Sequence, residues 1–119
     1  MEEAAVREVL EGERDTTLAR IGAMTAEFDE IVAATAGSNS DDEHDPEGST
    51  IAFERAKTAA LLLEAQAYLG DVDLALIRLD AGTYWTCERC DGPIAPERLA
   101  ARPATRTCIS CAATLWRGA

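Results

Sequence analysis

The sequence has 119 residues, of which 47% are hydrophobic, 28% are charged and 5% are aromatic. This length suits one compact domain or two small pieces, and it argues against an enzyme with separate cofactor and substrate domains. The 22 acidic and 11 basic side chains give a formal charge of −11. Because a surface this negative repels a phosphate backbone, the composition also argues against a protein that coats DNA or RNA.

The charge is distributed unevenly along the chain. Residues 1–81 carry 19 acidic and 6 basic side chains, whereas residues 82–119 carry 3 and 5. We therefore expect two domains, an acidic one over residues 1–81 and a slightly basic one over residues 82–119. No apolar run approaches the roughly 18–20 residues that span a bilayer, and the acidic N-terminus does not resemble a secretory signal. We expect no membrane partner and a cytoplasmic location.

Residues 3–36 are predicted to form one long helix. The segment contains no proline, and its apolar residues recur at steps of three and four, which is the spacing of one helical stripe. The stripe consists of Val6, Leu10, Leu18, Ile21, Met24, Phe28, Ile31 and Val32. Because Arg14 interrupts the stripe, we expect the first turns of this helix to pack less tightly than the rest.

Residues 37–49 are almost entirely polar and contain two glycines and a proline, which predicts an exposed turn at the tip of a helical hairpin. The lone histidine, His44, lies in this turn, more than forty residues from Cys87. We expect His44 to be a solvated loop residue rather than a metal ligand.

A second long helix follows the turn and ends at Ala81, because the next residue, Gly82, is a typical C-terminal stop. Its start has two candidates. One is Asp45 as a cap with Pro46 at the first helical position, and the other is Ser49 or Thr50.

The second helix carries apolar residues on two faces. The first seam contains Phe53, Ala56, Ala60, Leu63, Ala67, Leu74 and Ile77. The second seam contains Leu62, Ala65, Leu69, Val72, Leu76 and Leu79. Because one antiparallel partner covers one seam, we expect core packing on both faces and a second neighbour: the cysteine-bearing region, an N-terminal extension or a second chain.

Four cysteines follow the pattern C-x2-C-x17-C-x2-C: Cys87, Cys90, Cys108 and Cys111. Zinc needs four soft donors about 2.3 Å away, and a pair of cysteines two residues apart can bind one ion from a single tight turn. The pattern therefore predicts one structural Zn²⁺, with disulfides, free redox thiols and a zinc-linked redox switch as the alternatives. Four protein thiolates leave no position for an activated water, so the predicted site is not catalytic.

The predicted fold is mainly α: a long antiparallel helical hairpin, or coiled coil, with a small four-cysteine zinc-finger module and a short C-terminal helix at its base. We expect the module to fasten the base of the hairpin through Tyr84, Trp85, Ile94 and Leu99.

Motifs around the cysteines resemble the DksA/TraR zinc-finger family. They are Ala75-Leu76-Ile77-Arg78-Leu79-Asp80-Ala81-Gly82-Thr83-Tyr84, Cys87-x-x-Cys90, Pro93-Ile94, Glu97-Arg98-Leu99, Ala101-x-Pro103 and Cys108-x-x-Cys111. The likeness is specific over residues 75–113, and over residues 1–74 it rests on the acidic helix, the polar turn and the returning helix. Asp91 departs from the pattern, because many relatives have glycine directly after the second cysteine.

The resemblance implies a bacterial transcription regulator that binds RNA polymerase directly rather than promoter DNA. It implies that the coiled coil enters the secondary channel of the polymerase, where acidic residues at its tip approach the active centre and alter the stability of promoter complexes. Some members of the family also respond with ppGpp.

The family tip motif, Asp-x-x-Asp-x-Ala, is matched in part. Asp42 and Asp45 supply both aspartates, and Glu47 stands where alanine is expected, so these three are the candidate partner-binding residues. A second register, which starts at Asp45, keeps the first aspartate alone.

Other functions fit parts of the sequence. A zinc-stabilised protein–protein adaptor without direct effect on transcription would use the second helical seam. Nucleic-acid binding by the basic module is disfavoured by the acidic first 81 residues and by the lack of a recognition helix. No catalytic triad, phosphate loop or open metal site is visible, so we expect no enzyme, and we expect a monomer or weak dimer.

Overall fold

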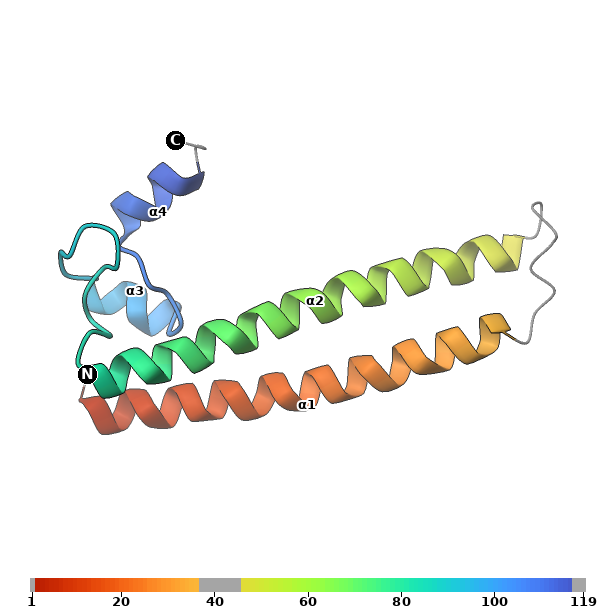
Figure 1. Ribbon diagram of the computed structural model, residues 1–119, viewed down its shortest axis with the longest axis horizontal. Coiled ribbons are helices and arrows are strands. Elements are labelled where there is room, and N and C mark those ends of the chain that lie inside the picture. The colour runs from red at the N-terminus through yellow and green to blue at the C-terminus, as the bar shows by residue number, and fades with distance from the viewer. Residues whose placement is uncertain (1, 37–45, 117–119) are drawn as a thin grey trace. The chain divides into compact units, whose positions relative to one another are not determined.

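The computed structural model describes residues 2–36 and 46–116 (Figure 1). Two long helices, α1 (Glu3–Ala36) and α2 (Pro46–Ala81), are followed by two short ones, α3 (Pro96–Ala101) and α4 (Ile109–Trp116). In the segment of the chain between α2 and α3, Thr86 and Pro93 form an isolated antiparallel β-bridge. The predicted mainly helical fold, with long helices and a four-cysteine group near its C-terminal end, is confirmed.

The bounds of α2 follow from its terminal residues. The helix begins at Pro46, which is the earlier of the two predicted starts and places proline where its missing N–H costs nothing. It ends before Gly82, whose φ of 80° suits a residue without a Cβ. The N–H of Thr83 donates to the Arg78 carbonyl at 2.9 Å, and the N–H of Gly82 donates to the Leu79 carbonyl at 3.2 Å. These two bonds form a Schellman cap, which satisfies carbonyls that the helix end leaves free.

The chain divides into two compact units. We call residues 1–16 with residues 68–119 the cysteine unit, and residues 17–67 the helix-pair unit. Each unit contains a part of α1 and an antiparallel part of α2 (Figure 1).

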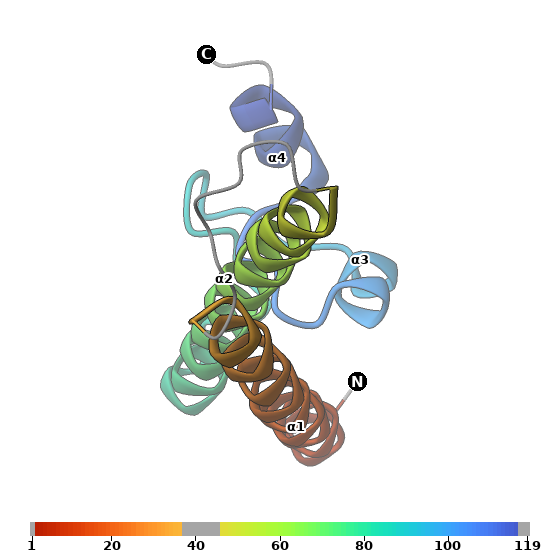
Figure 2. The same cartoon turned by 90° about the vertical axis from the view of Figure 1, so that its right-hand side faces the viewer.

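The core of the cysteine unit combines α1, α2, α3 and the cysteine loops. Its buried side chains are Val6, Leu10, Val72, Ala75, Leu79, Tyr84, Cys87, Ile94, Leu99 and Ala104. Figure 2 shows α3 and α4 as separate short helices on different sides of α2. The first turns of α1 are therefore enclosed by more than one neighbour.

The expectation that α1 packs loosely in its first turns is wrong. Val6 is 2% exposed and Leu10 is fully buried. Arg14 does not disturb this packing, because its Nε donates to an Asp73 carboxylate oxygen at 2.8 Å on a half-exposed edge. The charge that interrupts the stripe is paired with α2 and leaves the apolar positions intact.

The helix-pair unit buries small side chains. Among its described residues, the buried ones are Thr17, Thr58 and Ala65. On α2, the expected packing of the first seam is wrong in this unit, since Phe53 is 71% exposed and Leu63 is 67% exposed. No helix in the described parts of the chain combines the length and apolarity that crossing a membrane requires.

Candidate metal centre

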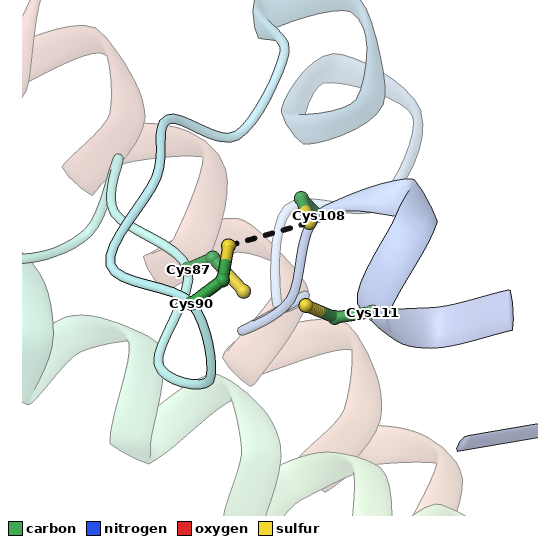
Figure 3. Close-up of side chains that lie close together, drawn as sticks. All are labelled: Cys87, Cys90, Cys108 and Cys111. Carbon is green, nitrogen blue, oxygen red and sulfur yellow. Dashed lines mark hydrogen bonds between the residues drawn. The ribbon is translucent and has the colours of Figure 1, made fainter. Parts of the chain in front are cut away.

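The four predicted cysteines come together in the cysteine unit (Figure 3). Their sulfur atoms all lie within 4.8 Å of one another, and the Sγ atoms of Cys90 and Cys108 are 3.8 Å apart. Four thiolates arranged tetrahedrally at about 2.3 Å from a zinc ion would be separated by about 3.8 Å. All four cysteines are free, and 3.8 Å is far longer than a disulfide bond, so the predicted disulfide alternative does not occur in this structure.

The first pair of cysteines sits on a tight turn. The N–H of Cys87 donates to the Gly92 carbonyl at 2.8 Å, and the N–H of Asp91 donates to the Cys87 carbonyl at 3.0 Å. Asp91 has a φ of 60°, in the left-handed region that favours glycine. This conformation gives a physical reason for glycine at this position in many relatives. The left-handed residue of this turn is Asp91 rather than Gly92, and the absence of a side chain at Gly92 leaves room for the Cys90 sulfur, which a Cβ there would meet at 3.3 Å.

The second pair belongs to the start of α4. Cys108 directly precedes the helix, Cys111 lies in its first turn, and the N–H of Ala112 donates to the Cys108 carbonyl at 3.0 Å. The free N–H groups and the positive end of the helix dipole favour negatively charged sulfur at this end.

The thiols differ in acidity because they share a small space. Backbone N–H groups, first that of Cys108, lower the pKa of Cys87 to about 6, and the N–H of Cys111 lowers the pKa of Cys108. Hydrogen bonding with Cys108 raises the pKa of Cys111 to about 12. The N–H of Gly92 acts to lower the pKa of Cys90, but the other contacts, chiefly the thiols of Cys87 and Cys108, leave it raised. The loops therefore favour two thiolates, while the crowding of four sulfurs opposes the ionisation of the other two. A divalent cation removes that conflict, since it stabilises thiolates together.

One guanidinium ties the cysteine loops to α2. Arg78 is buried to 11% side-chain exposure and donates to the carbonyls of Thr83, at 2.7 Å, and Thr86. Its Nη1 lies 3.6 Å from a carboxylate oxygen of Glu88, which stands between the first two cysteines. Glu88 also pairs with Arg106 at 3.6 Å, and its N–H donates to the Arg106 carbonyl at 2.9 Å. The end of α2 and the approach to each cysteine pair are thus joined through Arg78 and Glu88.

This fastening was not predicted from the sequence, although Arg78 lies within the motif that resembles the family. The sequence shows Arg78 as a basic residue in the last turn of a helix. Basic residues are common at this position because their charge complements the helix dipole. Such a signal does not reveal that the guanidinium turns toward loop carbonyls.

The predicted apolar anchors of the module occupy the core. Tyr84, Ile94 and Leu99 are buried, and Trp85 is partly buried with its ring in an edge-on contact to Tyr84 at 5.2 Å between centroids. The Tyr84 hydroxyl donates to the Pro103 carbonyl at 2.8 Å, which satisfies a polar group inside the core. Burial raises the pKa of this phenol.

The candidate tip residues are not placed by these observations. Asp42, His44 and Asp45 lie outside the described residues, and Glu47 is the second residue of α2. Their predicted roles stay predictions.

Comparison with known proteins agrees with the geometry of the cysteines. Residues 82–115 match the family model of the prokaryotic DksA/TraR C4-type zinc finger. An uncharacterized protein of Aquifex aeolicus (strain VF5) is 48% identical over 46 residues, which represent 39% of this chain but 32% of that protein. This chain therefore accounts for less than two thirds of that relative's length.

A solved structure shares the fold over nearly the whole chain. Transcription factor DksA2 from Pseudomonas aeruginosa is similar with a TM-score of 0.78 and 23% identity, over 97% of this chain and 83% of that chain. The clustered thiols and the family match together fit one structural Zn²⁺. Residues 82–115 thus carry the C4-type zinc finger of the DksA/TraR family, as the sequence motifs indicated, within a mainly helical fold similar to that of DksA2.

Proposed function

We propose that this protein is a transcription regulator that binds RNA polymerase directly. The observation that carries the proposal is the combination of a DksA/TraR zinc finger over residues 82–115 with a fold similar to that of a transcription factor over 97% of the chain. In this proposal the zinc ion has a structural function. Bound by Cys87, Cys90, Cys108 and Cys111, it would supply the cross-link that holds the two cysteine loops together, and Arg78 would hold those loops against the end of α2.

The finer proposal concerns the turn between α1 and α2. We place it in the secondary channel of the polymerase, with Asp42, Asp45 and Glu47 near the active centre. The segment from residue 41 to residue 47 contains five acidic residues beside His44 and Pro46, so it is suited to approach bound metal ions or basic side chains. The family resemblance supports this location, and the negative charge of residues 1–81 is compatible with it.

The first experiment measures binding and output separately. The purified protein is tested for co-sedimentation with core RNA polymerase, for competition with another secondary-channel protein, and for its effect on the lifetime of promoter complexes. We expect binding, competition and a changed lifetime. Absence of binding to core polymerase would refute the proposal as a whole.

A charge-matched pair of variants then tests the tip. Asp42→Asn with Asp45→Asn is expected to keep binding to polymerase and to lose the effect on promoter-complex lifetime. Glu27→Gln with Asp29→Asn removes the same charge from the exposed surface of α1 and should change neither. Equal behaviour of the two double variants would contradict a special function of the tip while leaving polymerase binding intact.

A protein–protein adaptor is the second candidate function. The exposed side chains Phe53 and Leu63 of the first seam of α2, and not the second seam expected from the sequence, favour it, because large apolar groups that are exposed together often mark an interaction surface. An adaptor would bind its partner without changing promoter-complex lifetimes, so the same measurements distinguish the two functions.

A further inference from the structure

In the helix-pair unit, α2 has one face that is covered and one that is open. Thr58 and Ala65 are each 6% exposed, and α1 is the helix that runs antiparallel to α2 in this unit (Figure 1). On the opposite face, Phe53 is 71% exposed and Leu63 is 67% exposed. Ala56, Ala60 and Ala67 are exposed on that same face. We call these five residues, Phe53, Ala56, Ala60, Leu63 and Ala67, the open seam.

The spacing of the open seam is that of a coiled coil. Its members follow one another at steps of three, four, three and four residues, so they occupy alternating a and d positions of a heptad. Thr58 and Ala65 take the f positions, which point directly away from a coiled-coil partner, and these are the buried positions of α2 in this unit. A strict a/d stripe is the narrow seam that a second helix buries, and it differs from the wider stripe of a helix on a globular core.

The open seam is complementary to itself when two copies run antiparallel. Suppose that Ala60 of one copy faces Leu63 of the other. The two-fold symmetry repeats this contact with the copies exchanged, and in the neighbouring layers Ala56 of one copy faces Ala67 of the other. Each large side chain then meets a small one, and each end layer pairs two alanines, which lets the helices approach closely. Phe53 extends the seam by one turn at each end.

Charges beside the seam select the same alignment. Lys57 and Glu64 occupy the e positions, which face each other across an antiparallel coiled coil. In the alignment above, Lys57 of each copy lies beside Glu64 of the other. A shift by one heptad in either direction would instead bring the two Lys57 side chains or the two Glu64 side chains together. Neither residue forms an ion pair with any side chain that the structure describes.

We propose that a second copy of this chain covers the open seam, which gives an antiparallel two-fold dimer through residues 53–67 of α2. Both size complementarity and charge complementarity point to the same partner and the same alignment, and a closed two-fold interface is the commonest form of self-association. The inference goes beyond polymerase binding and does not depend on it.

The dimer is expected to be weak, and its affinity is expected to increase as salt is added. The seam is short, and each copy carries a formal charge of −11, so long-range repulsion opposes association. Added salt screens this repulsion over about 10 Å at 0.1 M. The dissociation constant should therefore fall as the ionic strength rises, although the Lys57–Glu64 pairs alone would respond in the opposite sense.

Sedimentation velocity of the full chain over a roughly hundredfold concentration range tests the proposal. Leu63→Asp should raise the dissociation constant at least about a hundredfold, because it places two carboxylates in the seam. Since Leu63 is largely exposed within one copy, circular dichroism should show an unchanged helix content. The matched control is Leu18→Asp, at a 40% exposed leucine of α1, which should leave the dissociation constant unchanged.

A charge exchange tests the alignment. Lys57→Glu alone and Glu64→Lys alone should each raise the dissociation constant about tenfold, because each change turns two attractive pairs into repulsive ones. The double variant K57E/E64K should restore the dissociation constant of the unchanged protein. A monomer at every concentration, or a dimer that Leu63→Asp leaves intact, would overturn the proposal. Failure of the double variant to restore association would overturn the antiparallel alignment.

Polymerase binding is measured separately on the same variants. If Leu63→Asp abolishes self-association but retains co-sedimentation with core polymerase, the two proposals are independent. If the unchanged protein binds polymerase but never dimerises, the dimer proposal fails by itself.

Discussion

The cysteine unit and the helix-pair unit use the same two helices, yet they bury very different side chains. The cysteine unit encloses large residues such as Leu10 and Leu79, whereas the described part of the helix-pair unit buries Thr17, Thr58 and Ala65. The difference comes from the number of neighbours. In the cysteine unit, α3 and the cysteine loops cover apolar side chains, while in the helix-pair unit α1 alone leaves the open seam of α2 uncovered.

Stability is expected to be concentrated in the cysteine unit. Burying a leucine side chain contributes about 1.5–3 kcal/mol, so a unit that buries several of them gains far more than one that buries threonine and alanine. The cysteine unit would gain further from its metal. We therefore expect the two units to respond very differently to perturbation.

Removal of zinc should produce the largest difference between the units. Structural zinc contributes an apparent binding free energy of about 10–16 kcal/mol in small zinc domains, so chelation or Cys108→Ser should melt residues 82–116. Most of the helical signal in circular dichroism should remain, because α1 and α2 account for most of the helix. Hydrogen exchange should locate the loss of protection in the cysteine unit and leave residues 17–67 unchanged.

The control for this experiment is Ser110→Ala, at an exposed residue between Cys108 and Cys111. It should keep both zinc and protection. Loss of protection throughout α1 and α2 after chelation would mean that the two units unfold together, which contradicts the comparison.

Equivalent truncations of one leucine in each unit should differ by several kcal/mol. Leu10→Ala removes a fully buried side chain and should lower the free energy of unfolding by about 2–5 kcal/mol, because it leaves a cavity in the core of the cysteine unit. Leu63→Ala removes a side chain that is 67% exposed and should change it by less than about 0.5 kcal/mol. Urea denaturation at low protein concentration, where self-association is absent, measures both values. Similar costs for the two variants would show that burial in one copy does not govern their contributions.

Alkaline pH should weaken the cysteine unit through Tyr84. Burial raises the pKa of this phenol, so the folded state holds its proton more tightly than the unfolded state, where the pKa is about 10. The corresponding stability is present below about pH 10 and is lost as the pH rises through the raised pKa of the folded state. Tyr84→Phe should remove this part of the loss.

The same variant should also cost about 1–3 kcal/mol at neutral pH, because it leaves the Pro103 carbonyl without its donor. Tyr68→Phe is the comparison variant. Burial, together with the hydrogen bond that Tyr68 donates to Glu13 at 3.1 Å, raises the pKa of Tyr68, so each variant should remove its own share of the alkaline loss. Identical pH profiles for the unchanged protein and Tyr84→Phe would contradict the assignment.

Much of the fold and the metal centre followed from local sequence signals. The spacing of Cys87, Cys90, Cys108 and Cys111 predicted one cluster because a tetrahedral ion imposes that spacing. Gly82 predicted the end of α2 because a left-handed residue there needs no Cβ. Such signals succeed where a single residue type is strongly favoured by the local backbone or by the ligand.

Other features depend on tertiary contacts that the helical period does not contain. Periodicity identified two apolar seams on α2 but not which of them α1 covers, so Phe53 and Leu63 were expected in the core and lie exposed. In the same way, Arg14 suggested loose packing because a charge interrupts the apolar stripe. The sequence did not reveal its partner, Asp73, which lies far away along the chain. Arg78 illustrates the same limit, since its loop carbonyls are brought to it by the chain reversal at Gly82.

The smallest predicted effect concerns Asp91, where the sequence departs from the family pattern. At a φ of 60° a residue with a Cβ is strained, although aspartate tolerates this conformation better than most. Asp91→Gly should therefore stabilise the cysteine unit, by up to about 1 kcal/mol, because relief of strain exceeds the added entropy of the unfolded chain. Asp91→Ala removes the same charge but keeps the Cβ, so it should destabilise the unit by about the same amount.

Thermal unfolding of the zinc-loaded protein, followed by circular dichroism, compares the two Asp91 variants. Because both variants remove one negative charge near the cysteines, any electrostatic contribution is common to them. Their difference isolates the backbone. If Asp91→Gly and Asp91→Ala unfolded at the same temperature, the left-handed conformation would contribute nothing, and the departure from glycine at this position would have to be explained by the aspartate carboxylate itself.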